Sequence, residues 1–156
     1  MNFEYERSFS VESVDKYIDY CIKNGYRKIK EVWQNRIVYE NQTNRNLIAR
    51  ITKEKVNNIQ TCVFDCKNVV KKNGNLNESL ESLPLEINEK DIPSAQSMLE
   101  IMGFEQSANN TRERYVFAKN EVILEIDRYI TPKMNVIAIE GEKEQVENVY
   151  KEIVNL

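Results

Sequence analysis

Charged residues two positions apart recur along the sequence, inside runs that otherwise alternate polar and apolar side chains. The pairs are Glu4/Glu6, Asp65/Lys67, Arg112/Arg114, Glu125/Asp127 and Glu140/Glu142. Grouped carboxylates can hold hard divalent cations such as Mg²⁺, Mn²⁺ or Ca²⁺. Arginine and lysine bind phosphate oxygens through charge-assisted hydrogen bonds. If the pairs lie close together in the fold, they indicate a site for a nucleotide or an inorganic polyphosphate.

The alternation predicts β-strands, because a period of two places successive side chains on opposite faces of a sheet. A charged face is ordinarily the solvated side of an antiparallel sheet. Three amphipathic helices in the same chain favour another arrangement, since their apolar sides must cover the apolar face of the sheet. The charged face then points inward, and a charged interior is costly enough to indicate a functional site.

The strands are expected to pair mostly antiparallel, because short turns connect them. They are predicted over residues 2–9, 26–33, 36–40, 46–53, 59–70 and 83–88, and in three runs between 111 and 142. A turn is expected at Gln34 and Asn35, and residues 71–83 are expected to form a loop. The predicted fold class is α+β: an antiparallel tunnel barrel of about eight strands with helices packed outside.

Apolar residues at spacings of three and four predict three helices. The first is expected between a cap at Ser10 and a stop at Gly25. The second begins near Asp91 and is expected to bury Met98 and Met102, and the third closes the chain.

Composition excludes several classes of site. Histidine is absent, which excludes Ser-His and Cys-His catalysis and leaves carboxylates as the expected metal ligands. Cys21, Cys62 and Cys66 lack zinc-site spacing and are expected to pack as small apolar side chains. With 25 acidic and 22 basic side chains the net charge is −3, so a nucleic-acid partner is not expected.

At 156 residues the chain is expected to form one domain, residues 1–156. No apolar run approaches the roughly 18 residues that a membrane span requires, and the first residues lack a signal-peptide pattern. We therefore expect a soluble, cytoplasmic protein without a membrane partner. The sequence leaves open whether the chain forms a homodimer.

Taken in order along the whole chain, the charged pairs resemble the CYTH superfamily, which contains class IV adenylyl cyclases, thiamine triphosphatases and other triphosphate tunnel metalloenzymes. The resemblance is carried by Glu4-x-Glu6, Arg112-x-Arg114-Tyr115 after a helix ending in MGF, Glu125-x-Asp127 and the closing IAIEG. It implies an antiparallel tunnel in which acids hold Mg²⁺ or Mn²⁺ and bases hold a triphosphate or nucleotide.

The resemblance also implies roles for individual residues. It assigns metal binding to Glu4, Glu6, Asp127 and Glu140. It assigns phosphate binding to Arg50, Lys67, Arg112 and Arg114.

Several positions depart from the family pattern. Ser8 stands where the opening motif has a lysine, and Ala138 stands where the closing motif has a glutamate. Ile48 replaces the arginine that usually accompanies Arg50, and Glu142 is a candidate to compensate in part for Ala138. These departures leave the catalytic residue unassigned.

Three interpretations follow. The tunnel turns over a nucleoside triphosphate or another triphosphate, as a class IV adenylyl cyclase-like lyase or as a triphosphate hydrolase. Alternatively, it is catalytically degenerate and binds a nucleotide or polyphosphate signal without turnover. In the third interpretation the charges form internal salt bridges without a ligand, which is an expensive arrangement.

Overall fold

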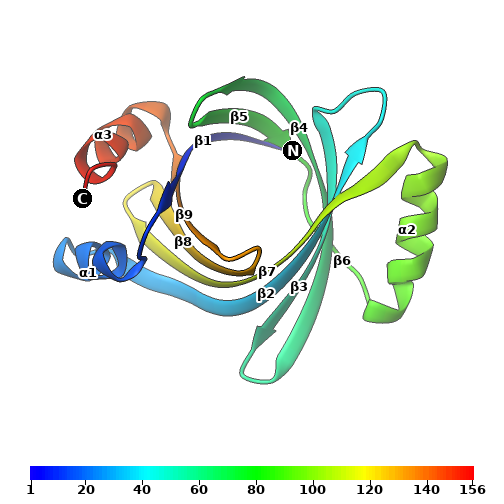
Figure 1. Cartoon of the computed structure of the whole chain (residues 1–156), viewed down its shortest axis with the longest axis horizontal. Coiled ribbons are helices and arrows are strands. Elements are labelled where there is room, and N and C mark those ends of the chain that lie inside the picture. The colour runs from blue at the N-terminus through cyan, green and yellow to red at the C-terminus, as the bar shows by residue number, and fades with distance from the viewer.

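The computed structural model describes residues 1–156 and shows an antiparallel β-sheet closed into a barrel (Figure 1). The strands are β1 (Asn2–Val11), β2 (Arg27–Asn41), β3 (Leu47–Val56), β4 (Ile59–Asn73), β5 (Leu76–Glu81), β6 (Leu85–Glu86), β7 (Phe104–Lys119), β8 (Val122–Thr131) and β9 (Met134–Gly141). The ring order is β3–β2–β7–β8–β9–β1–β5–β4, and pairing of β3 with β4 closes it. The short β6 pairs with β4 as an additional strand. The predicted α+β tunnel barrel is therefore confirmed.

Three helices pack outside the barrel: α1 (Asp15–Lys23), α2 (Ile92–Ile101), which follows a 3₁₀ turn (Glu89–Asp91), and α3 (Lys143–Ile153). Figure 1 shows α1 and α3 on one flank and α2 on the opposite flank. Tyr17 of α1 and Val146 of α3 are buried in one apolar cluster with residues of β8 and β9. Leu99 of α2 is buried in a second cluster with residues of β2, β3 and β4. The apolar face of the sheet thus lies under the helices, and the charged face lines the interior.

Strand β1 shows how the alternation divides the residues. Glu4 and Glu6 face the interior of the barrel. Tyr5 and Arg7 face outward, where the Tyr5 hydroxyl donates a hydrogen bond to Glu147 of α3 at 2.5 Å and Arg7 Nε donates one at 2.7 Å. Arg7 therefore cannot serve the interior, as the alternation predicted.

Two predictions about strands are wrong. β2 continues through Gln34 and Asn35, where a turn was expected, because the Gln34 side chain is buried and hydrogen-bonded inside the barrel. Residues 76–81, expected in a loop, form β5. The hairpin before β5 turns at Gly74, whose φ of 57° suits a tight turn. The inward face of β5 is polar, so its sequence lacks the usual apolar alternation.

Predictions about helix ends and burial also need correction. Ser10 lies within β1, and α1 begins only at Asp15. Met98 and Met102 are 61% and 57% exposed, because α2 touches the barrel along one narrow side. Cys66 is exposed on the outward face of β4, whereas the other two cysteines are buried. None of the helices combines the length and apolar character that crossing a membrane requires.

Candidate functional site

The barrel interior contains a polar cavity of about 520 Å³. Eight carboxylates and six bases line it: Glu4, Glu6, Glu54, Asp65, Glu81, Glu125, Asp127 and Glu140, with Lys30, Arg36, Arg50, Lys67, Arg112 and Arg114. All eight residues with an expected metal or phosphate role are among them. A second cavity of about 320 Å³ shares several lining residues with the first, so the two adjoin. We refer to them as the main and the adjoining chamber.

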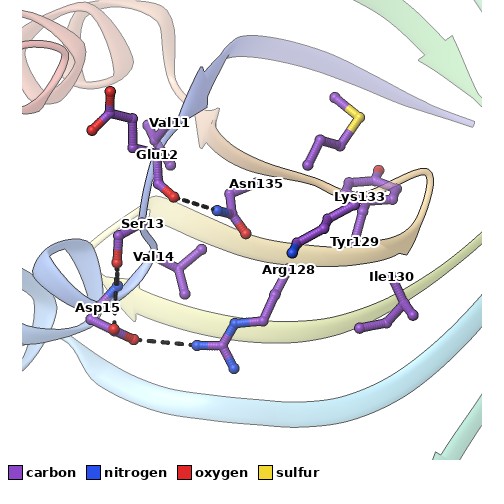
Figure 2. A pocket seen from close by; sticks show the side chains of 11 residues that line it. Val11, Glu12, Ser13, Val14, Asp15, Arg128, Tyr129, Ile130, Lys133 and Asn135 are labelled. Carbon is purple, nitrogen blue, oxygen red and sulfur yellow. Dashed lines mark hydrogen bonds and ion pairs between the residues drawn. The ribbon is translucent and has the colours of Figure 1, made fainter.

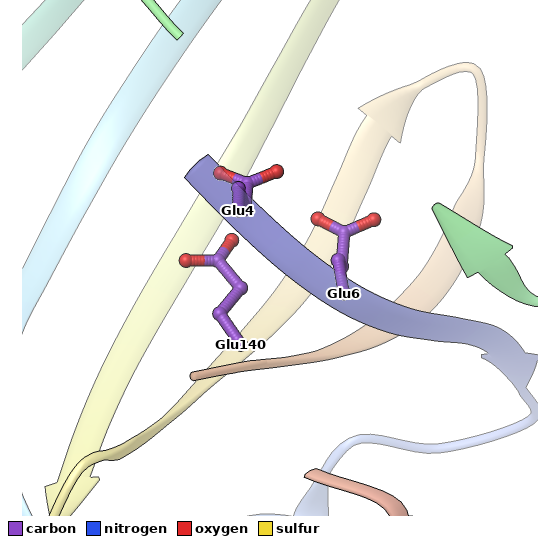
Figure 3. Close-up of side chains that lie close together, drawn as sticks. All are labelled: Glu4, Glu6 and Glu140. Carbon is purple, nitrogen blue, oxygen red and sulfur yellow. The ribbon is translucent and has the colours of Figure 1, made fainter. Parts of the chain in front are cut away.

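Three carboxylates form a compact group at one side of the main chamber (Figure 3). Glu4 and Glu6 project from β1 and Glu140 from β9, where Glu6 and Glu140 are partners in the strand register. One carboxylate oxygen from each lies within 4.8 Å of the others. Burial, followed by the charges of neighbouring carboxylates, raises the pKa of Glu140 well above its ordinary value. Burial also raises the pKa of Glu4, although Lys67 opposes the rise.

The geometry of this acidic group fits a hard divalent cation. Three converging carboxylate oxygens are a common ligand set for Mg²⁺ or Mn²⁺, which complete their coordination with water or phosphate oxygens. For Glu140 the burial of the carboxylate raises the pKa most, and the nearby charges of Glu125, Glu4 and Glu6 raise it further. A bound cation would offset those negative charges.

Asp127 lies apart from the acidic group and is held by two arginines. Its Oδ1 accepts a hydrogen bond from Arg114 Nε at 2.7 Å, and its Oδ2 accepts one from an Arg114 terminal nitrogen at 2.8 Å. Arg112 approaches Oδ2 at 3.1 Å. The Arg112 guanidinium also contacts the Gln34 amide oxygen and the Tyr129 hydroxyl. In this arrangement Asp127 bridges the two arginines, and Glu125 supplies a second negative charge to Arg114 at 2.5 Å.

The expected phosphate-binding residues of β3 and β4 are also paired. Arg50 forms two hydrogen bonds with Asp65, at 2.8 and 2.6 Å, and a third with Glu81 at 2.9 Å. Lys67 Nζ donates to Glu4 at 2.5 Å and lies 3.4 Å from Glu81. Lys67 thus connects the bases to the acidic group. A bound ligand could replace the contacts of Arg50 and Lys67 with carboxylates by contacts of its own.

Sequence reasoning missed the contribution of β2 to the chamber. Lys30, Gln34 and Arg36 line it, and the unbroken strand places them on one face. Their spacing was a usable signal, but the turn expected at Gln34 and Asn35 concealed it. Glu81 was also missed, because it belongs to the segment interpreted as a loop.

The two lost family groups face each other. In the register of β1 and β9, Ser8 is the partner of Ala138, and both line the main chamber. Glu142 does not compensate for Ala138, since its side chain caps α3 by accepting a hydrogen bond from the Glu144 backbone N–H at 3.0 Å. Ile48 lines the adjoining chamber, at the site of the missing arginine.

Another cavity, of about 660 Å³, lies outside the barrel between the start of α1 and the β8–β9 hairpin (Figure 2). Arg128 reaches Asp15 there at 3.2 Å, and the Asn135 amide donates to the Glu12 carbonyl oxygen at 2.8 Å. These polar groups satisfy one another, and no cluster of like charges faces the cavity. The chemistry is therefore concentrated in the barrel interior.

No protein-family model and no curated protein matches the sequence. Solved structures do match the fold. The PH1012 protein from Pyrococcus horikoshii OT3 gives a TM-score of 0.76 at 19% identity, over 95% of this chain and 88% of that chain. HpAC1 from Hippeastrum gives a TM-score of 0.69 at 14% identity, over 97% of this chain and 86% of that chain. HpAC1 is named as an adenylyl cyclase and has a dominant triphosphatase activity.

The same barrel also occurs in the Schizosaccharomyces pombe Mediator head module, with a TM-score of 0.63 at 8% identity over 97% of this chain and 92% of that chain. At these identities the similarities show the fold alone. The chain shares this barrel fold with HpAC1, which is named as an adenylyl cyclase, and the resemblance in the sequence implied a fold of this kind.

Proposed function

We propose that the tunnel binds a nucleoside triphosphate or another triphosphate together with a divalent cation, Mg²⁺ or Mn²⁺, and turns the triphosphate over. One observation carries the proposal: a group of mutually repelling carboxylates adjoins a set of inward-pointing bases within one enclosed cavity. The carboxylates can bind a cation, and the guanidinium and ammonium groups of the bases can bind an anion. A cation-bound triphosphate supplies both charges at once.

We assign the roles from the contacts. Glu4, Glu6 and Glu140 would hold the cation, because only these three converge. Arg112 and Arg114 would bind phosphate oxygens while Asp127 keeps their guanidinium groups aligned. Arg50 and Lys67 would bind phosphate oxygens from strands β3 and β4, while their carboxylate partners keep the two side chains in place.

Turnover in such a site depends on position and charge more than on covalent chemistry. The bound cation would neutralise charge on the phosphate oxygens. The arginines would fix the polyphosphate along the tunnel, and the barrel wall would limit access of water to it. Hydrolysis needs a water in line with the terminal phosphorus, and cyclisation needs the ribose 3′-hydroxyl in line with the α-phosphorus.

A second candidate function is capture of a nucleotide or polyphosphate without turnover. It is favoured by Ser8 and Ala138, which face each other where the family carries a lysine and a glutamate. A serine hydroxyl offers neither positive charge nor a useful base at neutral pH.

Thermal unfolding tests the binding site. Mg²⁺ alone, tripolyphosphate alone and both together should each raise the melting temperature, and the joint rise should exceed the sum of the separate rises. The reason is that each ligand removes a repulsion that hinders the other, and ligands that bind only the folded state stabilise it. Additive or absent shifts would contradict a shared metal–triphosphate site.

Product analysis separates the two candidates. The protein is incubated with ATP, tripolyphosphate or thiamine triphosphate, each with Mg²⁺ or Mn²⁺. Cyclic AMP with pyrophosphate would identify a cyclase, and free phosphate a hydrolase. Saturable binding without any product would favour the second candidate. A Glu4→Gln, Glu140→Gln variant serves as the control for contaminating phosphatases.

A further inference from the structure

Arg36 is the one base of the main chamber without an acidic partner. Lys30 pairs with Glu54, and the remaining four bases each contact at least one carboxylate. Arg36 forms a single side-chain hydrogen bond, from its Nε to the Thr52 hydroxyl at 3.0 Å. Its two terminal nitrogens have no protein acceptor.

The surroundings of Arg36 are cationic. The side chain lines both chambers and is half-buried. Burial, and then the charges of Arg112, Arg50 and Arg114, lowers its pKa. An arginine stays charged under such conditions, so the folded protein carries the cost of this unpaired guanidinium. A cost of that kind is typical of residues kept for a ligand.

The position of Arg36 relates it to a missing family residue. Arg36 lines both chambers, and it shares the adjoining chamber with Ile48 and Arg50. The resembling family carries a second arginine at the Ile48 position on β3. Here a guanidinium reaches the same chamber from the neighbouring strand, since β2 places Arg36 opposite Thr52 of β3.

We propose that Arg36 binds a phosphate group of the triphosphate through its two terminal nitrogens, and so replaces from β2 the arginine absent at Ile48. The planar, fork-like guanidinium suits two parallel hydrogen bonds to one phosphate. This proposal rests on the proposed function, because it concerns the same tunnel. It also gives the polyphosphate a direction, from the acidic group toward the adjoining chamber, where Lys72 adds further positive charge.

The test compares four variants with the natural protein by titration calorimetry with tripolyphosphate, in EDTA and again with Mg²⁺. Arg36→Met removes the charge at similar volume, and Arg36→Gln keeps a donor for Thr52. Arg36→Met combined with Ile48→Arg returns a guanidinium to the β3 position. Arg128→Met is the matched control, because Arg128 lies outside the tunnel and pairs with Glu113.

Both single Arg36 variants should bind tripolyphosphate about 10- to 150-fold more weakly, the range expected when hydrogen bonds to a charged group are lost. The double variant should recover most of that loss, and Arg128→Met should bind like the natural protein. Without ligand, Arg36→Met should melt at a higher temperature, because an unpaired, half-buried charge is gone. A purely structural arginine would instead lower the melting temperature when replaced.

Different results overturn different claims. If the natural protein binds tripolyphosphate and both Arg36 variants bind equally well, the role of Arg36 is refuted and the proposed function stands. If binding falls but Ile48→Arg restores none of it, the replacement of the β3 arginine is refuted. If the natural protein binds no tripolyphosphate in either buffer, both proposals fail.

Discussion

Replacing Asp127 by Asn tests whether this carboxylate neutralises arginines or binds metal. Asp127 is 2% exposed and receives contacts of 2.7, 2.8 and 3.1 Å from Arg114 and Arg112. Asparagine keeps the shape but removes the charge and turns one acceptor into a donor that faces a guanidinium. Neutralising one partner of a buried pair costs about 3–5 kcal/mol when the other charge is left uncompensated. Arg112 would lose its only carboxylate, whereas Arg114 would keep Glu125 at 2.5 Å.

The loss can be measured by urea denaturation followed by circular dichroism, with EDTA present. A loss of that size would lower the melting temperature by roughly 6–20 °C for a chain of this length. Glu113→Gln is the matched control, since Glu113 also lies on a barrel strand and pairs with an arginine, Arg128, at 2.9 Å. That pair is on the outer surface, so its loss should cost at most about 1 kcal/mol.

Ligand dependence sharpens the test. Saturating tripolyphosphate should shrink the penalty of Asp127→Asn, because phosphate oxygens then accept hydrogen bonds from Arg112 and Arg114. Affinity for Mg²⁺ alone should change little. A metal-free stability loss below about 1 kcal/mol, combined with a large fall in Mg²⁺ affinity, would refute the pairing role and make Asp127 a metal ligand.

Three further predictions concern the tunnel. Glu140→Gln should stabilise the metal-free protein at pH 7. The raised pKa of Glu140 means that its contribution to stability is full at low pH and is lost as the pH rises through that pKa. Urea denaturation from pH 5 to 8 should show that the unfolding free energy changes less with pH in the variant, and a destabilised variant would contradict the prediction. Arg112→Ala should weaken tripolyphosphate binding by about 1.5–3 kcal/mol, whereas Lys119→Ala, at the exposed end of β7, should change it little. Equal losses in calorimetry would mean that only general charge matters. Ser8→Lys with Ala138→Glu should raise turnover at least about tenfold over the natural protein if the lost pair limits catalysis; unchanged product formation, with binding intact, would locate the limitation elsewhere.

The sequence predicted the barrel because its main signal is local. Alternation assigns each side chain to one of two faces, and amphipathic helices identify which face must be covered. Glu4 and Tyr5, or Arg114 and Tyr115, are sorted correctly by that rule. The errors arose where local chemistry was misleading: Asn35 is of a type common in turns, yet the strand continues through it because the neighbouring Gln34 side chain is buried and hydrogen-bonded inside the barrel.

The pairing of charges could not be predicted, because it depends on strand register and on the tilt of strands across the barrel. Sequence placed Asp127 with the acids of the metal site. The register sets Asp127 opposite Arg114 instead, and Glu140 opposite Glu6. Arg36 is unpaired for the same kind of reason: the other charge pairs of the main chamber are formed between side chains of seven strands, and only the closed ring brings those strands together.

The departures from the family pattern at Ser8 and Ala138 cancel in charge. Ser8 and Ala138 remove one positive and one negative group from positions that face each other, so the total charge of the tunnel is unchanged by that pair. Ile48 removes a positive group, and Arg36 provides one in the same chamber. Binding of a polyphosphate depends on the summed charge and on the supply of donors, both of which the tunnel keeps. Turnover depends on particular groups at particular atoms, and the facing pair at Ser8 and Ala138 is where those groups are absent. The charge balance therefore supports retention of the ligand more strongly than retention of the reaction, and product analysis carries more weight than affinity in deciding between the two candidate functions.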